Sequence, residues 1–328
     1  MDFSVSRRTL LKTGAALGIA SAMPAYAQAK PNLRFAAVFS DKDIRARMIE
    51  MLAKDVETDF KIEPFLNGSL FKQGTELVAL ERNNLELANI APQDISNQLP
   101  EWSIVTSAYL FRDAKHLHTF FASPVAADLL KMVEDKLKVR ILGPTFFGTR
   151  QVGLKPTKKI TTPADMAGIK LRMPGGDAWQ FLGKSLGANP TPVAYAEVYT
   201  ALQTGAIDGQ DNPLPNVQNM KFYEVMSQMV MTSHLIGFDL LCISSKAWAA
   251  MTPAQQQKFQ AAATKAIQWS ADEHLKQEAE LVDFLKKQGL QINTPDVKAF
   301  RDHAQKMYLE SDLAKAWPKG LIDKINAL

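Results

Sequence analysis

Segments with the apolar pattern of strands alternate along almost the whole chain with segments patterned as amphipathic helices. Leu33–Phe39 is a short apolar strand pattern, and Asp41–Glu57 carries an apolar stripe at helical spacing. This alternation predicts an α/β fold, in which helices cover both faces of mixed, parallel-rich sheets. The length of 328 residues leaves room for two domains. Further strand patterns are Lys61–Leu66, Leu85–Ala91, Val139–Leu142, Gln151–Leu154 and Ile169–Met173.

The helical patterns differ in length. His116–Leu137 predicts one helix, and Ala196–Thr204 predicts another that stops at Gly205, because glycine readily adopts the left-handed conformation of a helix end. The longest pattern, Ala254–Gln288, follows the start signal Met251-Thr252-Pro253 and exceeds the usual length of a globular helix. We expect this helix to bridge two lobes. Because no flexible linker separates the lobes, we expect the chain to cross between them more than once.

The first 27 residues read as an export signal. Arg7, Arg8 and Lys12 precede a moderately apolar stretch, which ends in the cleavage motif Ala25-Tyr26-Ala27. The paired arginines resemble a twin-arginine signal, so we expect cleavage after Ala27 and a soluble product in the periplasm. Residues 1–27 are therefore set apart from the predicted fold.

Charge and cysteine content exclude several classes of protein. The 38 Lys and Arg residues against 34 Asp and Glu residues give a formal charge of only +4 with the signs interspersed. This balance argues against binding of nucleic acid or of an anionic membrane. The lone Cys242 excludes an intrachain disulfide and a CxxC site. It lies in the apolar run Ile236–Ile243, so we expect it to be a buried core residue.

Two motifs suggest catalysis or metal binding, but their contexts disfavour both. Gly183–Gly187 is a literal G-x-S-x-G around Ser185, yet the serine follows a helical pattern, whereas a nucleophile elbow places a strand before it. A secreted α/β hydrolase using Ser185 stays as the alternative from another class. His116 and His118 stand two apart, which on a helix points them in different directions, so we expect surface histidines. We expect no catalytic residue, metal site or cofactor.

Two arginines stand where a ligand could meet them. Arg150 lies at the entrance of the strand pattern Gln151–Leu154, and Arg172 lies inside the otherwise apolar Ile169–Met173. The carboxyl end of a parallel strand faces the crevice in which open α/β sheets bind ligands. A guanidinium group matches a carboxylate with two charge-assisted hydrogen bonds. From the residues alone, a surface position and a ligand contact remain equally open for Arg172.

A resemblance to a known family covers nearly the whole chain after the signal. Arg150, the segment Ile169–Pro174 and above all the string from Asn189 through ALQTGAIDGQDNP to Pro213 closely resemble the DctP-type substrate-binding proteins of TRAP transporters. The likeness continues through Asn67–Leu70 and Tyr109–Asp113. The family is one of receptors that deliver a small organic acid to membrane subunits for secondary active uptake.

The resemblance implies a two-lobed periplasmic binding protein of the Venus-flytrap kind, with crossing hinge strands and a long interlobe helix. Lobe I would take residues 28–148 plus about 238–275. Lobe II would take residues 149–237 plus about 276–328, with the C-terminal helices packing across it. The implied partners are the small and large TRAP membrane subunits. A binding protein that feeds a sensor stays open as a further alternative.

The resemblance also assigns roles in the ligand site. Arg172 would grip the ligand carboxylate, Arg150 would be a second cation near it, Asn212 would bond it from a loop, and Tyr195 would be the aromatic side chain beside the ligand. Alignment places mainly apolar residues on the other wall, which favours an aromatic or aliphatic monocarboxylate over sialic acid or a C4-dicarboxylate. These wall residues are Val38, Phe39, Phe71, Pro92 and Ile95, with Gln93 as the polar exception.

Overall fold

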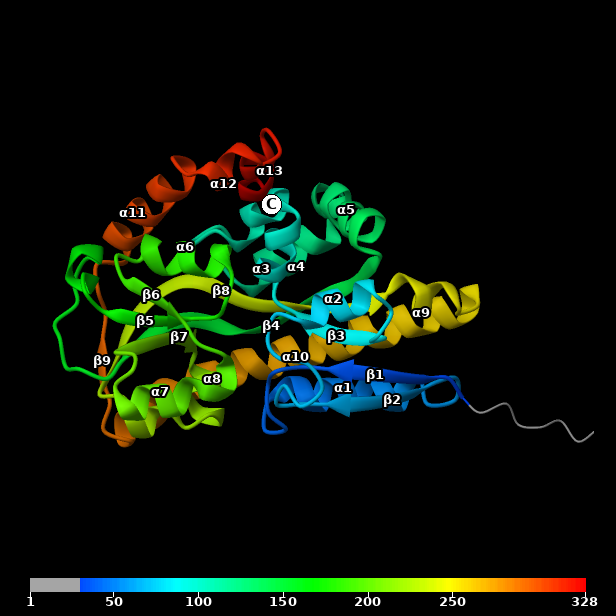
Figure 1. Cartoon of the computed structure of the whole chain (residues 1–328), viewed down its shortest axis with the longest axis horizontal. Coiled ribbons are helices and arrows are strands. Elements are labelled where there is room, and N and C mark those ends of the chain that lie inside the picture. The colour runs from blue at the N-terminus through cyan, green and yellow to red at the C-terminus, as the bar shows by residue number, and fades with distance from the viewer. Residues whose placement is uncertain (1–29) are drawn as a thin grey trace, which may run out of the picture. The chain divides into compact units, whose positions relative to one another are not determined.

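A mixed β-sheet forms the framework of the computed structural model, which describes residues 30–328. The export signal predicted for residues 1–27 lies outside the described residues. Within them the sheet has nine strands in the order β2-β1-β3-β8-β4-β7-β5-β6, and β9 pairs with β8 beside this path. Helices pack on both faces of the sheet (Figure 1). The predicted mixed α/β fold is therefore present.

The first part of the sheet comes from the N-terminal third of the described chain. β1 pairs in parallel with β2 and with β3, as the alternating pattern predicts. The single helix predicted for His116–Leu137 is in fact two helices, because the backbone is extended at Ser123 and Pro124 starts a new turn. The elements are β1 (Asn32–Ala36), α1 (Ile44–Asp55), β2 (Lys61–Phe65), α2 (Glu76–Glu81), β3 (Leu87–Ile90), α3 (Pro92–Gln98), η1 (Pro100–Thr106), α4 (Ala114–Ala122), η2 (Pro124–Ala126) and α5 (Ala127–Leu137).

Two long antiparallel strands connect this part to the rest of the sheet. β4 (Val139–Leu154) is one strand of 16 residues, whereas the patterns at its two ends predicted separate strands. Its partner β8 (Gln228–Ser244) has 17 residues. One end of β8 pairs with β3, and the other end pairs with β9. The pairing of β4 with β8 is irregular between Phe146 and Gly148, where Gly148 lies opposite Gly237.

The second part of the sheet repeats the parallel arrangement. β5 pairs in parallel with β6 and β7, and β7 pairs antiparallel with β4. Gly205 ends α7 with φ of 77°, the left-handed stop expected from the sequence. The elements are η3 (Pro163–Met166), β5 (Lys170–Met173), α6 (Asp177–Ser185), β6 (Asn189–Pro192), η4 (Tyr195–Glu197), α7 (Val198–Thr204), β7 (Gly209–Pro213), α8 (Leu214–Asn219) and η5 (Phe222–Val225).

The predicted long helix is α10 (Pro253–Lys287), which follows α9 (Ser245–Ala249). Thr252 and Gln255 form a capping box at its start, so two otherwise unpaired backbone amides are satisfied there. Phe259 packs into the same buried cluster as α1, and Leu281 packs into a cluster with α8. Figure 1 shows α10 running from the side of α1 to the side of α7 and α8. The helix therefore spans both parts of the sheet.

The C-terminal elements return along the other face to the first part of the sheet (Figure 1). His116 is buried, and its Nε2 lies 2.8 Å from the carbonyl oxygen of Ile325. The expectation that His116 is a surface residue is therefore wrong, because the last helix covers it, whereas His118 is partly exposed. These elements are β9 (Gln291–Asn293), α11 (Val297–Leu309), α12 (Asp312–Lys315) and α13 (Leu321–Asn326).

Buried apolar side chains form four clusters, one on each face of each part of the sheet. Neighbouring residues of one strand, such as Phe35 and Ala36, belong to different clusters because side chains alternate between the faces. Cys242 is fully buried, as predicted. None of the helices between residues 30 and 328 combines the length and the apolar character that crossing a bilayer requires.

Candidate functional site

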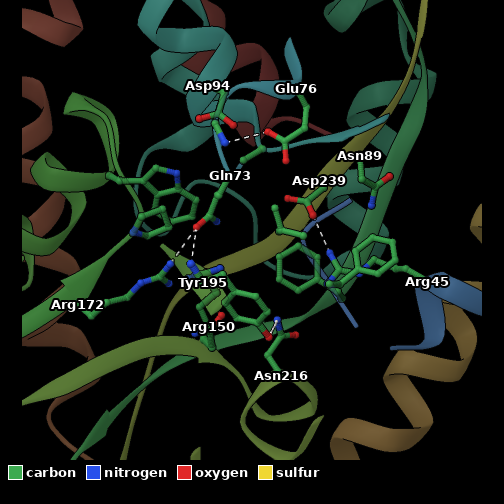
Figure 2. A pocket seen from close by; sticks show the side chains of 18 residues that line it. Arg45, Gln73, Glu76, Asn89, Asp94, Arg150, Arg172, Tyr195, Asn216 and Asp239 are labelled. Carbon is green, nitrogen blue, oxygen red and sulfur yellow. Dashed lines mark hydrogen bonds and ion pairs between the residues drawn. The ribbon is translucent and has the colours of Figure 1, made fainter. Parts of the chain in front are cut away.

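A cavity lies where segments following the strands of both parts of the sheet converge (Figure 2). Side chains reach it from just after β1, from the end of β3 and from α3, and on the other side from β5, β7 and α8. The crossing strands β4 and β8 contribute Arg150 and Asp239. The space between these side chains amounts to about 540 Å³, including its opening to solvent. The cavity lies at the edge where α/β folds bind their ligands.

Arg172, on β5, lines this cavity and is 1% exposed. Its Nε donates to the carbonyl oxygen of Val193 at 2.7 Å, and its Nη2 donates to Oε1 of Gln73 at 3.1 Å. No carboxylate among residues 30–328 forms a salt bridge with it. Burial lowers the pKa of Arg172 to about 10, because desolvation disfavours the charged guanidinium group. A buried cation without a counterion is costly, so this position favours an anionic ligand.

Arg150, on β4, lines the same cavity but already has a carboxylate partner. Its Nε donates to Oδ2 of Asp211 at 2.7 Å, and its Nη2 donates to Oδ1 at 2.9 Å. Burial alone would raise the pKa of Asp211, but Arg150 and His234 outweigh it and hold that pKa well below its usual range. The guanidinium group of Arg150 also lies 4.8 Å from the ring of Trp179. Its charge is thus largely compensated within the protein, unlike that of Arg172.

Tyr195 and Asn212 lie on the same wall as the two arginines. The hydroxyl group of Tyr195 accepts a hydrogen bond of 2.9 Å from Nδ2 of Asn216, on α8. Nδ2 of Asn212, on β7, donates to Oε1 of Gln210 at 2.5 Å. The ring of Tyr195 lies 5.9 Å from the Arg172 guanidinium group. The structure therefore brings together the four residues to which the resemblance assigned the carboxylate end of a ligand.

Gln73 connects the two walls of the cavity and was missed by the sequence reasoning. It lies in the loop before α2, and its Oε1 accepts hydrogen bonds from Arg172 and, at 2.9 Å, from the backbone amide of Tyr195. One side-chain oxygen thus meets two donors from the second part of the sheet. No motif in the sequence marks this glutamine, because its partners lie about a hundred residues away.

The wall opposite Arg172 differs from the apolar wall expected by alignment. Val38 and Phe39 line the cavity, but Phe71, Pro92 and Gln93 do not. Pro92 and Gln93 are buried in the first turn of α3, and Phe71 packs on the apolar core together with buried Ile95. The side chains that line this wall are mostly polar and come from α1, α2, α3, β3, β8 and the loop before α2. They are Arg45, Gln73, Glu76, Asn89, Asp94 and Asp239.

Arg45, on α1, is held on this wall by two carboxylates. Its Nη2 donates to Oδ2 of Asp43 at 2.8 Å, and its Nη1 donates to Oδ2 of Asp239 at 2.6 Å. The guanidinium group lies between the rings of Phe39 and Phe147, at 4.4 and 4.1 Å from their centres. The isolated aspartate in the apolar run Ile236–Ile243 was a signal for this ion pair that the sequence reasoning did not use.

Three carboxyl groups share the polar wall, namely those of Glu76, Asp94 and Asp239. Burial raises the pKa of Glu76 to about 7, although the amide of Gly74 donates to its Oε2 at 2.8 Å. Burial and the charges of Glu76 and Asp239 raise the pKa of Asp94 to about 8. Burial likewise raises the pKa of Asp239, against the pull of Arg45. Crowded carboxyl groups in a desolvated cavity retain protons, because each charge opposes the next.

Two asparagines leave a buried acceptor unused in the cavity. Oδ1 of Asn89 and Oδ1 of Asn216 form no hydrogen bond with residues 30–328, although both side chains are nine-tenths or more buried. Their amide nitrogens are engaged, by Thr145 and Tyr195 respectively. Buried polar atoms normally have partners, so these acceptors suit hydroxyl groups of a bound molecule.

A cavity between two parts of a crossing sheet, with one buried cation that forms no salt bridge within residues 30–328, defines a binding protein for a small anionic solute. The chain belongs to the family of DctP, the bacterial extracellular solute-binding proteins of family 7, whose sequence model matches residues 35–313. It is a solute receptor of the TRAP type, and the family prediction made from the sequence is confirmed.

Relatives and solved structures agree with this family. The chain is 34% identical over 234 residues to the sialic acid-binding periplasmic protein SiaP of Vibrio cholerae, covering 70% of each chain. A TRAP periplasmic solute-binding protein of Roseobacter denitrificans with bound 3-deoxy-D-manno-oct-2-ulosonic acid (KDO) is 44% identical, with a TM-score of 0.90 over 91% of this chain and 99% of that one. One from Polaromonas bound to D-erythronate is 27% identical, with a TM-score of 0.84 over 91% and 99%.

The hydrolase alternative finds no support in the structure. Ser185 is the last residue of α6, is fully buried, and its hydroxyl group donates to the carbonyl oxygen of Leu182 in the same helix. A nucleophile elbow needs an exposed serine on a turn between a strand and a helix. Proteins of this family are solute receptors and not enzymes, as predicted.

Proposed function

We propose that this protein captures a sugar acid, a monocarboxylate carrying several hydroxyl groups, and delivers it to TRAP membrane subunits. The observation that carries the proposal is the contrast between the two walls of the cavity. Arg172 offers a buried cation without a salt bridge, whereas the opposite wall offers carboxyl and amide groups. Carboxyl and amide groups form hydrogen bonds with hydroxyl groups of a ligand. An aromatic or aliphatic tail would bury them without a hydrogen-bond partner, which costs free energy.

Known ligands of similar proteins support this class. KDO, the compound bound to the Roseobacter protein, and D-erythronate, the compound bound to the Polaromonas protein, each combine one carboxylate with several hydroxyl groups. The higher identity of the Roseobacter protein makes KDO the first compound to test.

The proposed mechanism is closure of two lobes around the ligand. The lobe boundaries that the family resemblance implies, at 148/149 and about 237/238, would fall near Gly148 and Gly237, which face each other across β4 and β8. The third boundary, at about 275, falls in α10 three residues before Glu278, whose Oε1 accepts from the amide of Thr149 at 2.6 Å. The three proposed crossings would thus lie together, as a hinge requires. Gln73 would bind across the lobes, and the membrane subunits would recognise the closed form.

The proposal also places the receptor in the periplasm after removal of the signal in residues 1–27. Its twin-arginine type is a proposal that rests on Arg7 and Arg8. Sequencing the N-terminus of the exported protein tests the cleavage site, with Gln28 expected as the first residue.

Calorimetric titration of the purified protein tests the ligand class. We expect KDO or D-erythronate to bind saturably and to raise the melting temperature, since a ligand that binds only the folded state stabilises it. Phenylacetate represents an acid with an aromatic tail and succinate a C4-dicarboxylate, and we expect both to bind weakly or not at all. Tighter binding of phenylacetate than of every hydroxylated acid would overturn the proposed ligand class.

A further inference from the structure

The acidic side chains of the cavity are concentrated on the side away from Arg172 and Arg150. Figure 2 shows Asp94 and Glu76 together there, with Asp239 nearer to Arg45. They come from α3, from the start of α2 and from β8, so elements distant in sequence converge on this position. The cavity is therefore polarised, with a cation at one end and carboxyl groups at the other.

The positive charge near these carboxyl groups is already used. Arg45 is the cation facing them, and it is shared between Asp43 and Asp239. His274, on α10, lies behind Asp43 at 3.8 Å. The carboxyl group of Asp94 forms no hydrogen bond or ion pair with residues 30–328, and Glu76 is bonded to backbone amides alone. No side chain in the described cavity would therefore neutralise a second anionic group of a ligand.

A separate observation shows that this end of the cavity is built to receive hydrogen-bond donors. Oδ1 of Asn89 is an unpartnered acceptor on a side chain that is 7% exposed, and it lines the same cavity as the carboxyl groups. Its amide nitrogen is occupied by Thr145 at 3.2 Å, which orients the oxygen. Hydroxyl groups can donate to this oxygen and to carboxyl oxygens, whereas carboxylate and phosphate groups cannot.

We infer that Glu76, Asp94 and Asp239 determine the charge of the accepted ligand, admitting acids with one anionic group and a hydroxylated far end and rejecting acids with a second carboxylate or a phosphate. The inference rests on the proposed function and deepens it. Like charges brought together in a desolvated site repel strongly, which is a common way to exclude a wrong partner. Glu76 and Asp94 carry this charge only above their raised pKa values of about 7 and about 8, so the exclusion should strengthen as the pH rises through that range.

Matched pairs of ligands test the inference by calorimetry at pH 9, which is above the raised pKa values of Glu76 and Asp94, so that both groups are charged. KDO is compared with its 8-phosphate, and galactonate with galactarate, which replaces the terminal CH₂OH group by a carboxylate. We expect the doubly charged member of a pair to bind about 100-fold or more weakly, because like charges repel in the desolvated site. Asp94→Asn should reduce this ratio about tenfold, since it removes one charge and keeps an acceptor of the same shape.

Two controls separate charge from fit. Glu76→Gln should reduce the ratio in the same direction, and it replaces Asp94→Asn if that variant fails to fold. Asp312→Asn removes an exposed carboxylate far along the chain and should leave the ratio unchanged.

The outcomes distinguish this inference from the proposed function. Equal binding of both members of a pair would overturn the inference while the proposed function stands. If neither carboxyl variant changes the ratio of affinities within a pair, the shape of the cavity and not its charge excludes the doubly charged acid. That result would also overturn the inference. Failure of all four acids to bind would overturn the sugar-acid proposal, and the inference with it.

Discussion

At the scale of single residues, two buried arginines of the cavity show why position alone does not define a ligand contact. Arg150 and Arg172 are both less than 5% exposed. The first meets Asp211 in a bidentate ion pair, and the second meets only neutral oxygens of Val193 and Gln73. The carboxylate of a ligand therefore gains most at Arg172, where it relieves an uncompensated charge.

Arg172→Ala should weaken binding of the cognate sugar acid by about 2–5 kcal/mol, which is about 30-fold to several-thousand-fold. Arg172→Lys should also bind poorly, because an ammonium group cannot reproduce the planar fork. Titration calorimetry measures both, with the exposed Arg82→Lys as the matched control. Unchanged affinity in Arg172→Ala would remove this residue from the site.

Asp211→Asn should destabilise the unliganded protein by about 3–5 kcal/mol, because it leaves the Arg150 charge buried without its partner. Urea unfolding at neutral pH measures the loss. The low pKa of Asp211 also means that its contribution is present above the ordinary aspartate pKa and is lost as the pH falls through the lower, folded-state pKa. A variant as stable as the wild type would show that the ion pair contributes little.

The raised pKa values on the other wall act in the opposite direction. Folded Glu76 and Asp94 hold protons up to about pH 7 and about pH 8, whereas the unfolded carboxyl groups lose them near pH 4. The folded state thus binds more protons in this window, so stability should fall as the pH rises from about 4 to about 8. Melting curves of the unliganded protein should show a smaller decline over this range in Asp94→Asn. An unchanged slope in the variant would contradict the raised pKa of Asp94.

At the scale of elements, the crossing strands depend on a close approach at Gly148. Its φ of 115° suits glycine, and a side chain there would lie 2.7 Å from Cβ of Pro213. We expect Gly148→Ala to cost at least about 2 kcal/mol in urea unfolding, from backbone strain and collision together. Gly168→Ala is the matched control, since φ is 80° there but no atom lies within 4 Å, and it should cost about 1 kcal/mol. Equal costs would show that the contact with Pro213 is unimportant.

Local pattern predicted the helices and short parallel strands better than it predicted β4 and β8. Thr252 starts α10 and Gly205 ends α7. Both act through contacts within a few residues, so the local sequence predicts these two helix ends. β4 has apolar residues on both faces and bulges in its middle, which interrupts the period of two. The end of α4 at Ser123 is indicated in the sequence by the dipeptide Ser123-Pro124. The continuous apolar stripe on both sides of it nevertheless favoured a single helix over His116–Leu137.

At the scale of the whole molecule, the two walls of the site differed in how far the sequence could predict them. Arg172 lies in the segment Ile169–Pro174, and Tyr195 and Asn212 lie in the string from Asn189 to Pro213, so a resemblance that covers both segments could assign all three. The polar wall joins Gln73, Asp94 and other residues from separate loops, helices and strands, and their proximity exists only in the folded chain. The alignment instead selected Phe71 and Pro92, which precede Gln73 and Asp94 by two residues each; Phe71 packs on the apolar core, and Pro92 is buried in α3.

A crystal structure of the protein with KDO tests the central claim most directly, because it locates both ends of the ligand. The account predicts the carboxylate within hydrogen-bond distance of the Arg172 guanidinium group and the hydroxylated chain toward Asn89 and Asp94. A ligand bound with its carboxylate away from Arg172, or bound outside this cavity, would contradict it.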